Sequence, residues 1–389
     1  MIEIKHKVDC TGCGACVDIC NHNAISWMED SEGFKYPSVN ADICTDCGSC
    51  NRVCPIIQNG VTNKYNSKTP KTYAAYIKDH DVHFQSTTGG LYSALADEML
   101  TRGGYIGGAV WTDDFGVKSL VSNRPEDLLR IRGSKYFQSD ATGMYRQIKE
   151  LLRKGEKVLV CGTPCQIAGL HNFVGNKDEN LITIDFICCS INSPKVFRKY
   201  KESLERRYGG KMISYHPKNK EYGGWHNFAF KAEFDNGKVY AANRTEDDFT
   251  YCFIGSHVAA RPACYECKFK GFPRYSDITI ADFWGIENCD SEMDNPIGTS
   301  LVLLNSKKGE EYYQTIRTKL VDKEERLEDA LVGNSNAVTS IHYPKINRNI
   351  FYWAVDKIDF HTLVSITRVE PRLYMIKNKL KRKISKIWN

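Results

Sequence analysis

Residues 156–194 read EKVLVCGTPCQIAGLHNFVGNKDENLITIDFICCSINSP, and this stretch decides the fold of the larger part of the chain. It contains two consecutive units in which a short apolar strand is followed by a loop and a helix. A cysteine stands just beyond each strand, Cys165 in the first unit and Cys188 in the second. Pro194 suits the first turn of a helix, where its missing N–H is not needed. The predicted strands are 158–161 and 181–187, and the predicted helices are 166–173 and 195–208.

Fully apolar strands that alternate with helices indicate a parallel sheet that is covered on both faces. Sheets of this kind bind ligands beyond the carboxyl ends of their strands. We therefore expect Cys165 and Cys188 to face the binding crevice. Further on, the alternating residues 228–234 and 238–240 flank the turn Asp235-Asn236-Gly237. This hairpin pattern predicts an antiparallel insertion into an α/β domain whose sheet is partly parallel.

The composition is that of a globular protein of two or three domains, since the 389 residues are 42% hydrophobic and 26% charged. The formal net charge of +6 is dispersed along the chain and predicts no nucleic-acid partner. The 16 cysteines are spaced like metal ligands, and residues 1–7 lack the apolar run of an export signal. No stretch approaches the length of a membrane span. We therefore expect a cytoplasmic protein.

The first segment carries one cysteine pattern twice. Cys10-x2-Cys13-x2-Cys16-x3-Cys20 returns as Cys44-x2-Cys47-x2-Cys50-x3-Cys54-Pro55, with an offset of 44 − 10 = 34 residues. This spacing is typical of bacterial ferredoxins with two 4Fe-4S clusters, in which the fourth cysteine of each run ligates the other cluster. Zinc knuckles would leave the third cysteine of each triplet without a role. We predict a two-cluster ferredoxin domain over residues 1–56, with one cluster on Cys10, Cys13, Cys16 and Cys54 and the second on Cys44, Cys47, Cys50 and Cys20.

Apolar residues between the two cysteine runs are expected to screen the clusters from water and to tune their potentials. Asn21 follows Cys20 where the usual run has proline, which concerns the rigidity of the loop more than ligation. The expected screening residues are Ile25, Trp27, Phe34, Tyr36 and Ile43.

Residues 57–70 are polar, rich in turn residues and without period, so we predict a linker there and a second domain over residues 71–345. In that domain, Thr87-Thr88-Gly89-Gly90 follow the strand 73–77 and precede a helix. Glycines and a helix N-terminus can accept a phosphate, although such a turn is more often only a helix cap. The loop 133–139 offers a cation and several hydroxyls, and its alternative interpretation is a solvated turn.

Two further features stay open on sequence grounds. Cys264-x2-Cys267 fits a zinc site, a redox disulfide or cluster ligation equally well. Lys218, Lys220 and Trp225 fit a substrate mouth, but a solvated loop is the simpler interpretation. The remaining cysteines, Cys161, Cys252 and Cys289, are expected to be core or surface thiols.

These motifs, taken in order over residues 1–305, resemble the coenzyme F420 hydrogenase/dehydrogenase beta-subunit family, in particular its members with an N-terminal two-cluster ferredoxin domain. The resemblance is carried by the doubled cysteine run, Thr87 to Gly90, Gly133-Ser134-Lys135-Tyr136, Gly162-Thr163-Pro164-Cys165-Gln166, Cys188, the Cys264/Cys267 pair and residues 277–285. Members of the family bind FAD and a further 4Fe-4S cluster. The same superfamily includes a plant reductase of hydroxymethyl-chlorophyll, so the resemblance implies an iron–sulfur flavoprotein more firmly than it implies F420 as substrate.

The resemblance implies that Cys165, Cys188, Cys264 and Cys267 ligate a third 4Fe-4S cluster. Where the family usually has Cys-His-Gly, this chain has Cys188-Cys189-Ser190, so either thiol suits the role, and register favours Cys188. The resemblance also places FAD along three loops, with its pyrophosphate toward the helix that begins at Leu91. The implied flavin contacts are Thr87, Thr88, Gly89, Gly90, Ser134, Lys135, Tyr136, Thr163, Pro164 and Gln166.

On these grounds we expect an oxidoreductase in which two ferredoxin-type clusters, a third cluster and FAD exchange electrons with a small organic hydride partner, F420 or another molecule. No catalytic residue is predicted. The expected protein partner is an electron donor or acceptor, such as a ferredoxin or a subunit of a redox complex. One alternative is a non-catalytic electron-relay subunit of a larger complex, and another is a zinc-stabilised scaffold.

The C-terminal segment, residues 346–389, is predicted to be helical and basic. From Arg372 onward it has seven Lys or Arg, no acidic residue and apolar residues at helical spacing. Such a helix can lie on an anionic membrane surface, here the inner face, or it can dock as an ordinary terminal helix.

Overall fold

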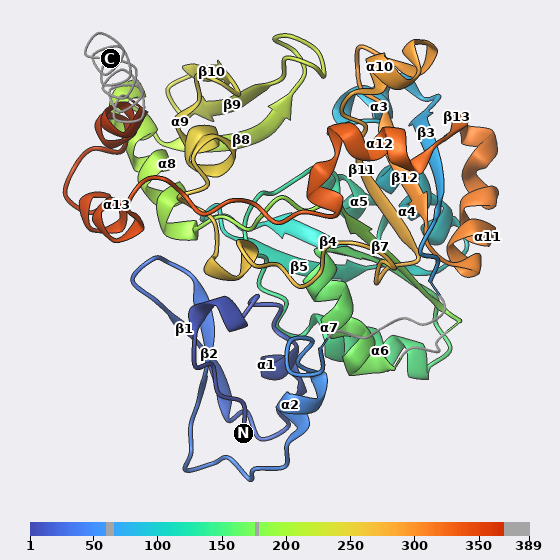
Figure 1. The fold of residues 1–389 in the computed structure, drawn as a ribbon, viewed down its shortest axis with the longest axis horizontal. Helices are drawn as coiled ribbons and strands as arrows, with labels where there is room; N and C mark the ends of the chain where they lie inside the picture. Colours follow the sequence, from blue (N-terminus) through green and yellow to red (C-terminus); the bar gives the residue numbers. More distant parts are fainter. Residues whose placement is uncertain (60–65, 176–178, 369–389) are drawn as a thin grey trace, which may run out of the picture.

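A mixed eight-stranded sheet forms the centre of the molecule (Figure 1). The computed structural model describes residues 1–59, 66–175 and 179–368. The strand order is β13-β3-β12-β11-β7-β6-β4-β5, and the neighbours from β11 to β4 run parallel. This confirms the predicted partly parallel sheet. The strands are β3 (Lys71–Ile77), β4 (Tyr105–Trp111), β5 (Val117–Ser122), β6 (Val158–Gly162), β7 (Leu181–Phe186), β11 (Ile278–Asp282), β12 (Ser300–Leu304) and β13 (Leu320–Glu325).

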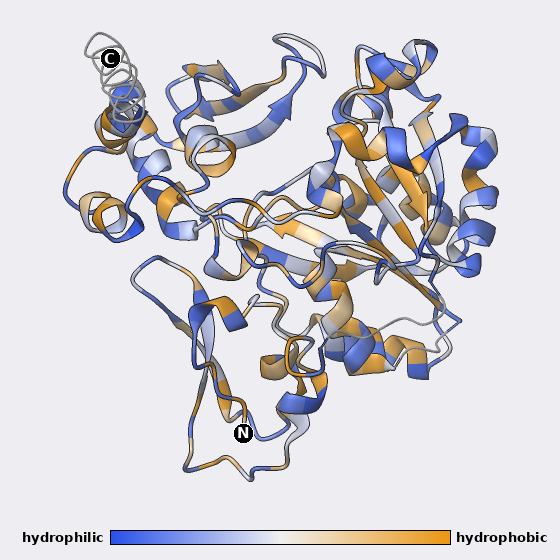
Figure 2. Ribbon diagram, in the orientation of Figure 1, coloured by the Kyte–Doolittle hydropathy of each residue, from blue (hydrophilic) through white to orange (hydrophobic). Residues whose placement is uncertain are grey.

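Alternate strand residues bury opposite faces of this sheet, as the two-residue period of a strand requires. In β6, Leu159 packs on one face with α4 and α5, while Val158 and Val160 pack on the other with α6 and α7. Figure 2 shows the apolar strands of this sheet in orange. The helices around the sheet are α3 (His80–Gln85), α4 (Leu91–Thr101), α5 (Pro125–Ile131), α6 (Met144–Arg153), α7 (Pro164–Val174), α8 (Pro194–Tyr208), α10 (Ile286–Cys289), α11 (Lys307–Ile316) and α12 (Leu327–Gly333).

The two helices that follow β6 and β7 begin with capping residues. Thr163 accepts a hydrogen bond from the Gln166 backbone N–H and the Gln166 side chain accepts one from the Thr163 backbone, which makes a capping box before α7. Ser193 caps α8 in a similar way at Val196, and Pro194 occupies the first turn. These local signals explain why the two predicted strand–loop–helix units form within a few residues of the predicted bounds.

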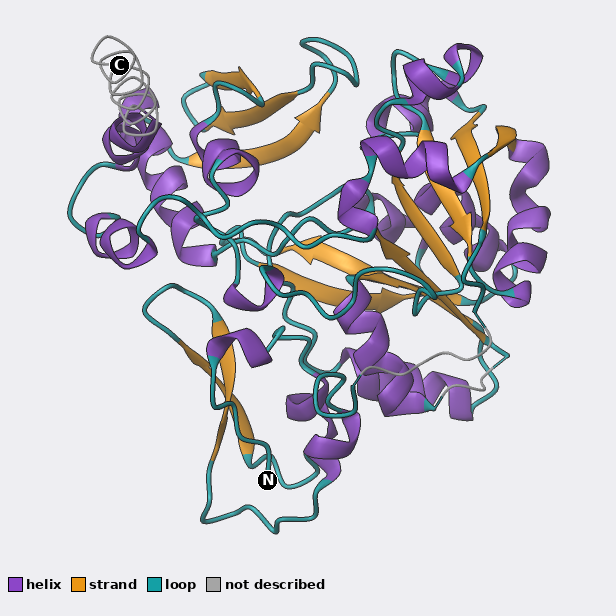
Figure 3. Cartoon of the chain, viewed as in Figure 1, coloured by secondary structure: helices purple, strands orange, loops and turns teal. Residues whose placement is uncertain are grey.

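A three-stranded antiparallel sheet projects from the main sheet and carries the C-terminal helices (Figure 3). Aromatic rings of α8, including Phe197 and Tyr200, pack with rings of this sheet and with Phe360. The predicted antiparallel insertion is therefore confirmed. Its elements are β8 (Met212–Asn219), β9 (Ala229–Phe234), β10 (Val239–Asn243), α9 (Asp248–Thr250) and α13 (Arg348–Ala354), and residues 360–368 are also helical.

The N-terminal cysteine-rich segment packs against α6 and α7 (Figure 1). Ala15 and Val53 belong to the same apolar cluster as Ile148 and Leu170. The carboxylate of Asp18 accepts hydrogen bonds from the backbone N–H groups of Gly143 and Arg146 at 3.0 and 3.1 Å, so it caps the start of α6 from another part of the chain. The elements of this segment are α1 (Ala15–Ile19), β1 (Ile25–Glu29), β2 (Lys35–Val39) and α2 (Ser49–Val53).

Two of the predicted segments fall partly or wholly outside the described residues. Residues 60–65 of the predicted linker and the predicted basic tail from Arg372 are not among them. In the part of the chain that the structure describes, none of the helices combines the length and the apolar character needed to cross a membrane.

Candidate metal centres and flavin site

Three cavities of the described structure are lined by cysteines, and the first lies within the N-terminal segment. Its wall contains Cys10, Cys13, Cys16 and Cys54, the four residues predicted to ligate one cluster. We call it the inner cavity. Cys10, Cys13 and Cys16 are buried next to apolar side chains and Cys54 is partly buried. Burial raises the pKa of Cys13 well above the ordinary value and also raises that of Cys54. Apolar neighbours in the same wall are Ile2, Ile4, Trp27 and Ile56.

The second cavity, here called the outer cavity, lies at the free end of the N-terminal segment. It is lined by Cys20, Cys44, Cys47 and Cys50, the other predicted set. Cys47 is exposed, and a hydrogen bond with the Ser49 hydroxyl lowers the pKa of its thiol. Ile43, predicted as a screening residue, is instead about half exposed because the loop that carries it faces solvent.

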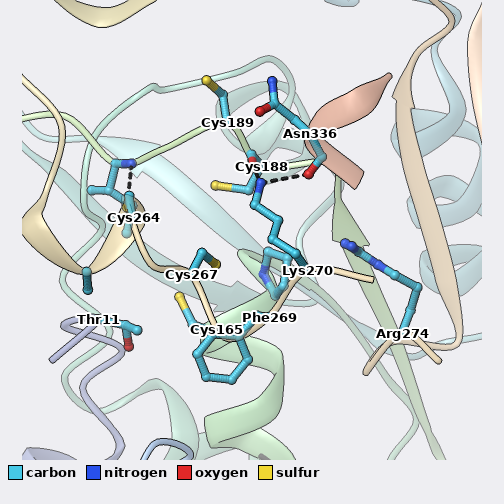
Figure 4. A pocket seen from close by; sticks show the side chains of 13 residues that line it. Thr11, Cys165, Cys188, Cys189, Cys264, Cys267, Phe269, Lys270, Arg274 and Asn336 are labelled. Carbon is cyan, nitrogen blue, oxygen red and sulfur yellow. Dashed lines mark hydrogen bonds between the residues drawn. The ribbon is translucent and has the colours of Figure 1, made fainter. Parts of the chain in front are cut away.

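The third cavity joins segments that are far apart in the sequence (Figure 4). Cys165 lies in the first turn of α7, Cys188 follows β7, and Cys264 and Cys267 come from the loop before β11. All of them line one space with an empty volume of about 440 Å³. Burial raises the pKa of Cys165 to about 11 and that of Cys264 to about 12.

Both adjacent cysteines of the Cys188-Cys189 pair line the third cavity, but their sulfur atoms point in different directions. In Figure 4 the sulfur of Cys188 is directed toward Cys165, Cys264 and Cys267, whereas the sulfur of Cys189 points away from them. Burial raises the pKa of Cys188 well above its ordinary value, and Cys264 is the next largest cause. Burial also raises the pKa of Cys189, while Lys270 and Ser190 act in the opposite direction, and no other cysteine contributes to this shift. The geometry therefore favours Cys188 as the member of the set.

In each cavity the thiols stand around a space instead of meeting at a point. Within residues 1–59, 66–175 and 179–368, no three metal-binding side chains converge closely enough to hold a single ion. A four-iron cube is wider than one ion and carries its thiolates on separate corners. The donor sets and their spread thus fit such cubes.

The inner and third cavities are neighbours. Thr11 lines both of them, and its hydroxyl interacts with the thiol of Cys165, which lowers that pKa against the larger effect of burial. Ile56, from the wall of the inner cavity, packs with Cys165 and Cys267. The three cavities therefore lie in a row, with the outer cavity farthest from the main sheet, the inner cavity next and the third cavity beside the sheet.

The segments predicted to contact a flavin meet at the carboxyl edge of the sheet. The Ile77 N–H, at the end of β3, donates to the Gly89 carbonyl at 2.8 Å, and the Ser134 N–H donates to the Thr87 hydroxyl at 3.1 Å. Thr163 directly follows β6. The structure thus brings the three predicted loops to one edge, which is where sheets of this kind bind ligands.

Several of the predicted flavin contacts already have protein partners. The Lys135 ammonium donates to the carbonyls of Arg130, Ile131 and Arg132 at 2.8 to 2.9 Å, so it caps the end of α5. The Thr88 hydroxyl donates to the Thr299 carbonyl at 3.2 Å. Gln166 Nε2 donates to Ser139 Oγ at 2.8 Å, and Pro164 lines the third cavity. A direct role for Lys135 in flavin binding stays a prediction that requires this cap to open.

The glycine pair serves packing within the protein. A Cβ on Gly89 would stand 2.5 Å from the Ala75 carbonyl oxygen, and one on Gly90 would stand 2.7 Å from Ile77 Cγ2. Gly90 also has φ +81, which favours glycine. These glycines therefore allow strand β3 to approach closely, through the Ala75 carbonyl at Gly89 and the Ile77 side chain at Gly90. Their contact with a flavin stays a prediction.

Sequence reasoning missed two groups of buried polar residues. Lys218 pairs with Asp282, Lys220 donates to the carbonyls of His83, Thr88 and Ile297, and Trp225 is fully buried, so this stretch is not a solvated loop. Arg261 is also fully buried and reaches the backbone of Cys10. The only local sequence signal for Arg261 is its position three residues before Cys264.

Comparison with known proteins agrees with this geometry. A 4Fe-4S dicluster domain matches residues 9–56. The N-terminal part of the beta subunit of coenzyme F420 hydrogenase/dehydrogenase matches residues 72–144, and its C-terminal part matches residues 155–329. These two models describe one family and together cover well over half of the chain. The chain belongs to the coenzyme F420 hydrogenase/dehydrogenase beta-subunit family.

Relatives of this chain occur in archaea. An F(420)H(2) dehydrogenase subunit of Methanosarcina mazei is 21% identical over 342 residues, which are 85% of this chain and 87% of the relative. An uncharacterized protein of Methanocaldococcus jannaschii is 24% identical over 347 residues, 80% and 88% of the two chains. A chain of the F420-reducing [NiFe] hydrogenase complex from Methanosarcina barkeri is similar with a TM-score of 0.47 and 19% identity, over 71% of this chain and 93% of that one.

The family and the dicluster domain establish an iron–sulfur protein of the oxidoreductase type, with electron transfer as its general activity. This conclusion does not depend on any single cavity. The cavities add which thiols lie together and in which order.

Proposed function

We propose that this protein is an iron–sulfur flavoenzyme that moves electrons between a partner protein and a small organic molecule. Three 4Fe-4S clusters would occupy the outer, inner and third cavities, and FAD would lie at the carboxyl edge of the sheet. The observation that carries the proposal is the row of three thiol-lined cavities, the last of which opens at the loops that follow β6 and β7.

The ligand sets proposed for the clusters are the four thiols of each cavity. In the inner and third cavities burial disfavours the thiolate form, so an adjacent cation is needed to stabilise the charge. A cluster of iron ions supplies that cation. The outer cavity contains the exposed Cys47, which makes it the entry or exit point that we propose for the partner protein.

The support for FAD is the family membership together with the meeting of the Thr87, Ser134 and Thr163 loops at one edge. When bound, a flavin exchanges single electrons with clusters and electron pairs with organic substrates. Residues of this chain would position the flavin. The Thr87 and Ser134 loops would lie on one side of it, and the Thr163 loop, which caps α7 beside Cys165, would lie on the other. We propose a hydride partner of the F420 type, because a relative over most of the chain is named as an F420H2 dehydrogenase subunit.

The test is to purify the protein anaerobically, measure iron, sulfide and flavin, and compare two adjacent cysteine variants. We expect about twelve irons in the wild type, about four fewer in Cys188→Ser and no loss in Cys189→Ser. About eight irons in the wild type would contradict the third cluster. Flavin content near zero, with clusters intact, would favour the electron-relay subunit instead of the enzyme.

Substrate assignment needs a separate measurement. Reduced protein should be mixed with oxidised F420, and oxidised protein with F420H2, while flavin and cluster absorbance are followed. Rapid exchange in either direction supports F420 chemistry. No exchange by a flavin-loaded preparation would overturn the F420 assignment while leaving the flavoenzyme proposal in place.

A further inference from the structure

Arg261 is a buried cation at the junction of the inner and third cavities. Its side chain is 0% exposed. Nε donates to the Cys10 carbonyl at 2.7 Å, and one terminal nitrogen donates to Gln138 Oε1 at 2.6 Å. The other terminal nitrogen lies 3.0 Å from the Lys35 carbonyl and 3.5 Å from Cys10 Sγ. The centroid of the Tyr36 ring lies 4.3 Å from the guanidinium carbon.

These partners include no carboxylate, and in this respect Arg261 differs from two neighbours. Arg274, in the wall of the third cavity, pairs with Asp185 at 3.0 Å. Arg348 pairs with Glu32 at 2.7 Å across the same interface as Arg261. Among the residues that the structure describes, Arg261 has no acidic group within ion-pair distance. A fully buried charge without a counter-charge is costly, so a negative group is expected beside it.

The neighbouring groups that can become negative are the cysteines, because they carry charge as thiolates when they ligate a cluster. Cys10 Sγ lies 3.5 Å from a terminal nitrogen of the guanidinium, and Cys264 of the third cavity donates its backbone N–H to the Arg261 carbonyl at 2.9 Å. Gly12 keeps this contact possible, because a Cβ there would stand 2.9 Å from the terminal nitrogen of Arg261 and 2.2 Å from Gln138 Nε2. A thiolate-ligated cluster carries net negative charge that grows by one unit with each electron it accepts.

We propose that Arg261 is the counter-cation of the inner cluster and raises its reduction potential above that of the outer cluster. This inference rests on the proposed function, because it requires clusters in the cavities. The step concerned is the transfer of one electron from the outer cluster, which is oxidised, to the inner cluster, which is reduced, with no bond or proton exchanged. The fixed positive charge favours the reduced inner cluster and so draws electrons inward.

The test is a potentiometric titration followed by EPR of the full chain purified with its clusters. The signal of the inner cluster is identified as the one that survives both in Cys47→Ser, which lacks the outer cluster, and in Cys188→Ser, which lacks the third cluster. Arg261→Gln keeps a hydrogen-bond donor and loses the charge. In this variant we expect the midpoint potential of the inner cluster to become more negative by about 59 mV or more, which for one electron is a tenfold change in the reduced-to-oxidised ratio. In Arg261→Lys, which keeps the charge, most of the wild-type potential should remain.

Two further variants test whether a shift in potential comes from the charge of Arg261. Gln138→Glu places a carboxylate against the guanidinium without removing it, and the inner midpoint should again become more negative, so an Arg261→Gln chain that fails to assemble does not end the test. Arg348→Gln is the matched control, since it removes a partly buried arginine of the same interface whose hydrogen-bond partners in the described chain include no cysteine. Its midpoint should equal that of the wild type.

The outcomes separate the two proposals. A wild-type protein without iron in these cavities would contradict the proposed function. Full iron content with an unchanged inner midpoint in both Arg261→Gln and Gln138→Glu would overturn the role of Arg261 and leave the proposed function intact. A shift of equal size in Arg348→Gln would also overturn it, because the effect would then belong to the interface as a whole.

Discussion

The two copies of the cysteine motif share one spacing but have different surroundings. Cys13 of the first copy is buried against α6 and α7, and its carbonyl accepts a 2.7 Å hydrogen bond from the Tyr145 hydroxyl. Cys47, the matching residue of the second copy, is exposed. The neighbouring Asp46 pairs with the N-terminal ammonium at the surface. The first copy is a docking surface as well as a ligand set, and the second is a ligand set alone.

This difference shows what a ligand motif determines and what it leaves to the rest of the fold. The spacing groups the thiols, while docking decides how far water, partner proteins and fixed charges can approach them. Matched substitutions at positions 34 residues apart therefore measure the effect of docking, because the local sequence pattern is held constant.

The largest contrast is expected between Cys13→Ser and Cys47→Ser. Each variant should lose about four irons. Cys13→Ser should also destabilise the fold by about 1–3 kcal/mol, because its hydroxyl would be buried in an apolar cluster. Iron analysis and thermal unfolding under anaerobic conditions measure both effects. Equal losses of stability in the two variants would contradict the difference in docking.

Next is the left-handed position that precedes Cys13 and Cys47, occupied by Gly12 with φ +70 and by Asp46 with φ 49. In Gly12→Ala the new Cβ would displace Gln138 and Arg261, both held by hydrogen bonds, and we expect a loss of about 1–3 kcal/mol. Asp46→Ala meets no comparable obstacle, so its apparent melting temperature should change much less. If the two variants behave alike, backbone strain alone explains the glycine.

A smaller effect is expected at Asp18 and its counterpart Arg52. Asp18→Ala removes the cap of α6 and should cost about 1–2 kcal/mol. Arg52 is hydrogen-bonded at the surface to Cys47 and Ser49 of its own loop, so Arg52→Ala should stay within about 0.5 kcal/mol of the wild type. The free energies of unfolding of the two variants are compared by chemical denaturation. An Asp18→Ala protein as stable as the wild type would show that this cap does not stabilise the docked N-terminal segment.

The smallest effect is kinetic and needs no substitution. An iron chelator added to the anaerobic protein should release iron in phases, with the outer cluster first, because Cys47 is exposed and the inner thiols are buried. The phases should differ several-fold in rate and are followed by the loss of visible absorbance. The assignment is checked with Cys47→Ser, which should lack the fast phase. A single phase for all the iron would indicate that access does not differ.

Much of the fold was predictable because its signals are local. The run 158–161, the cap at Thr163 and the proline at 194 lie within a few residues of the elements they determine, so β6, α7, β7 and α8 form close to the predicted bounds. The grouping of the eight N-terminal cysteines into the two sets that line the inner and outer cavities also followed from spacing alone.

What could not be predicted depends on contacts between distant segments. Lys218 and Lys220 lie in a polar, glycine-rich stretch that suggests exposure, yet both are buried. Lys218 pairs with Asp282, and Lys220 donates to the carbonyls of His83 and Ile297. Gly89 likewise serves the close approach of Ala75 and Ser300. Cys188 also shares its cavity with Cys264, which lies more than 70 residues away in the sequence.

The burial of Cys13 has a consequence for the order of biosynthesis. The residues that cover it, Tyr145 and the α7 helix around Gly169, are made long after the first cysteine run has left the ribosome. At 5–20 residues per second, roughly 10–30 seconds separate the synthesis of Cys13 from that of the end of α7. During that interval the N-terminal thiols have no cover from the main sheet. Iron and sulfide delivered in that interval would meet a Cys13 that α6 and α7 do not yet cover, whereas iron and sulfide delivered after docking would have to reach a Cys13 packed against these helices.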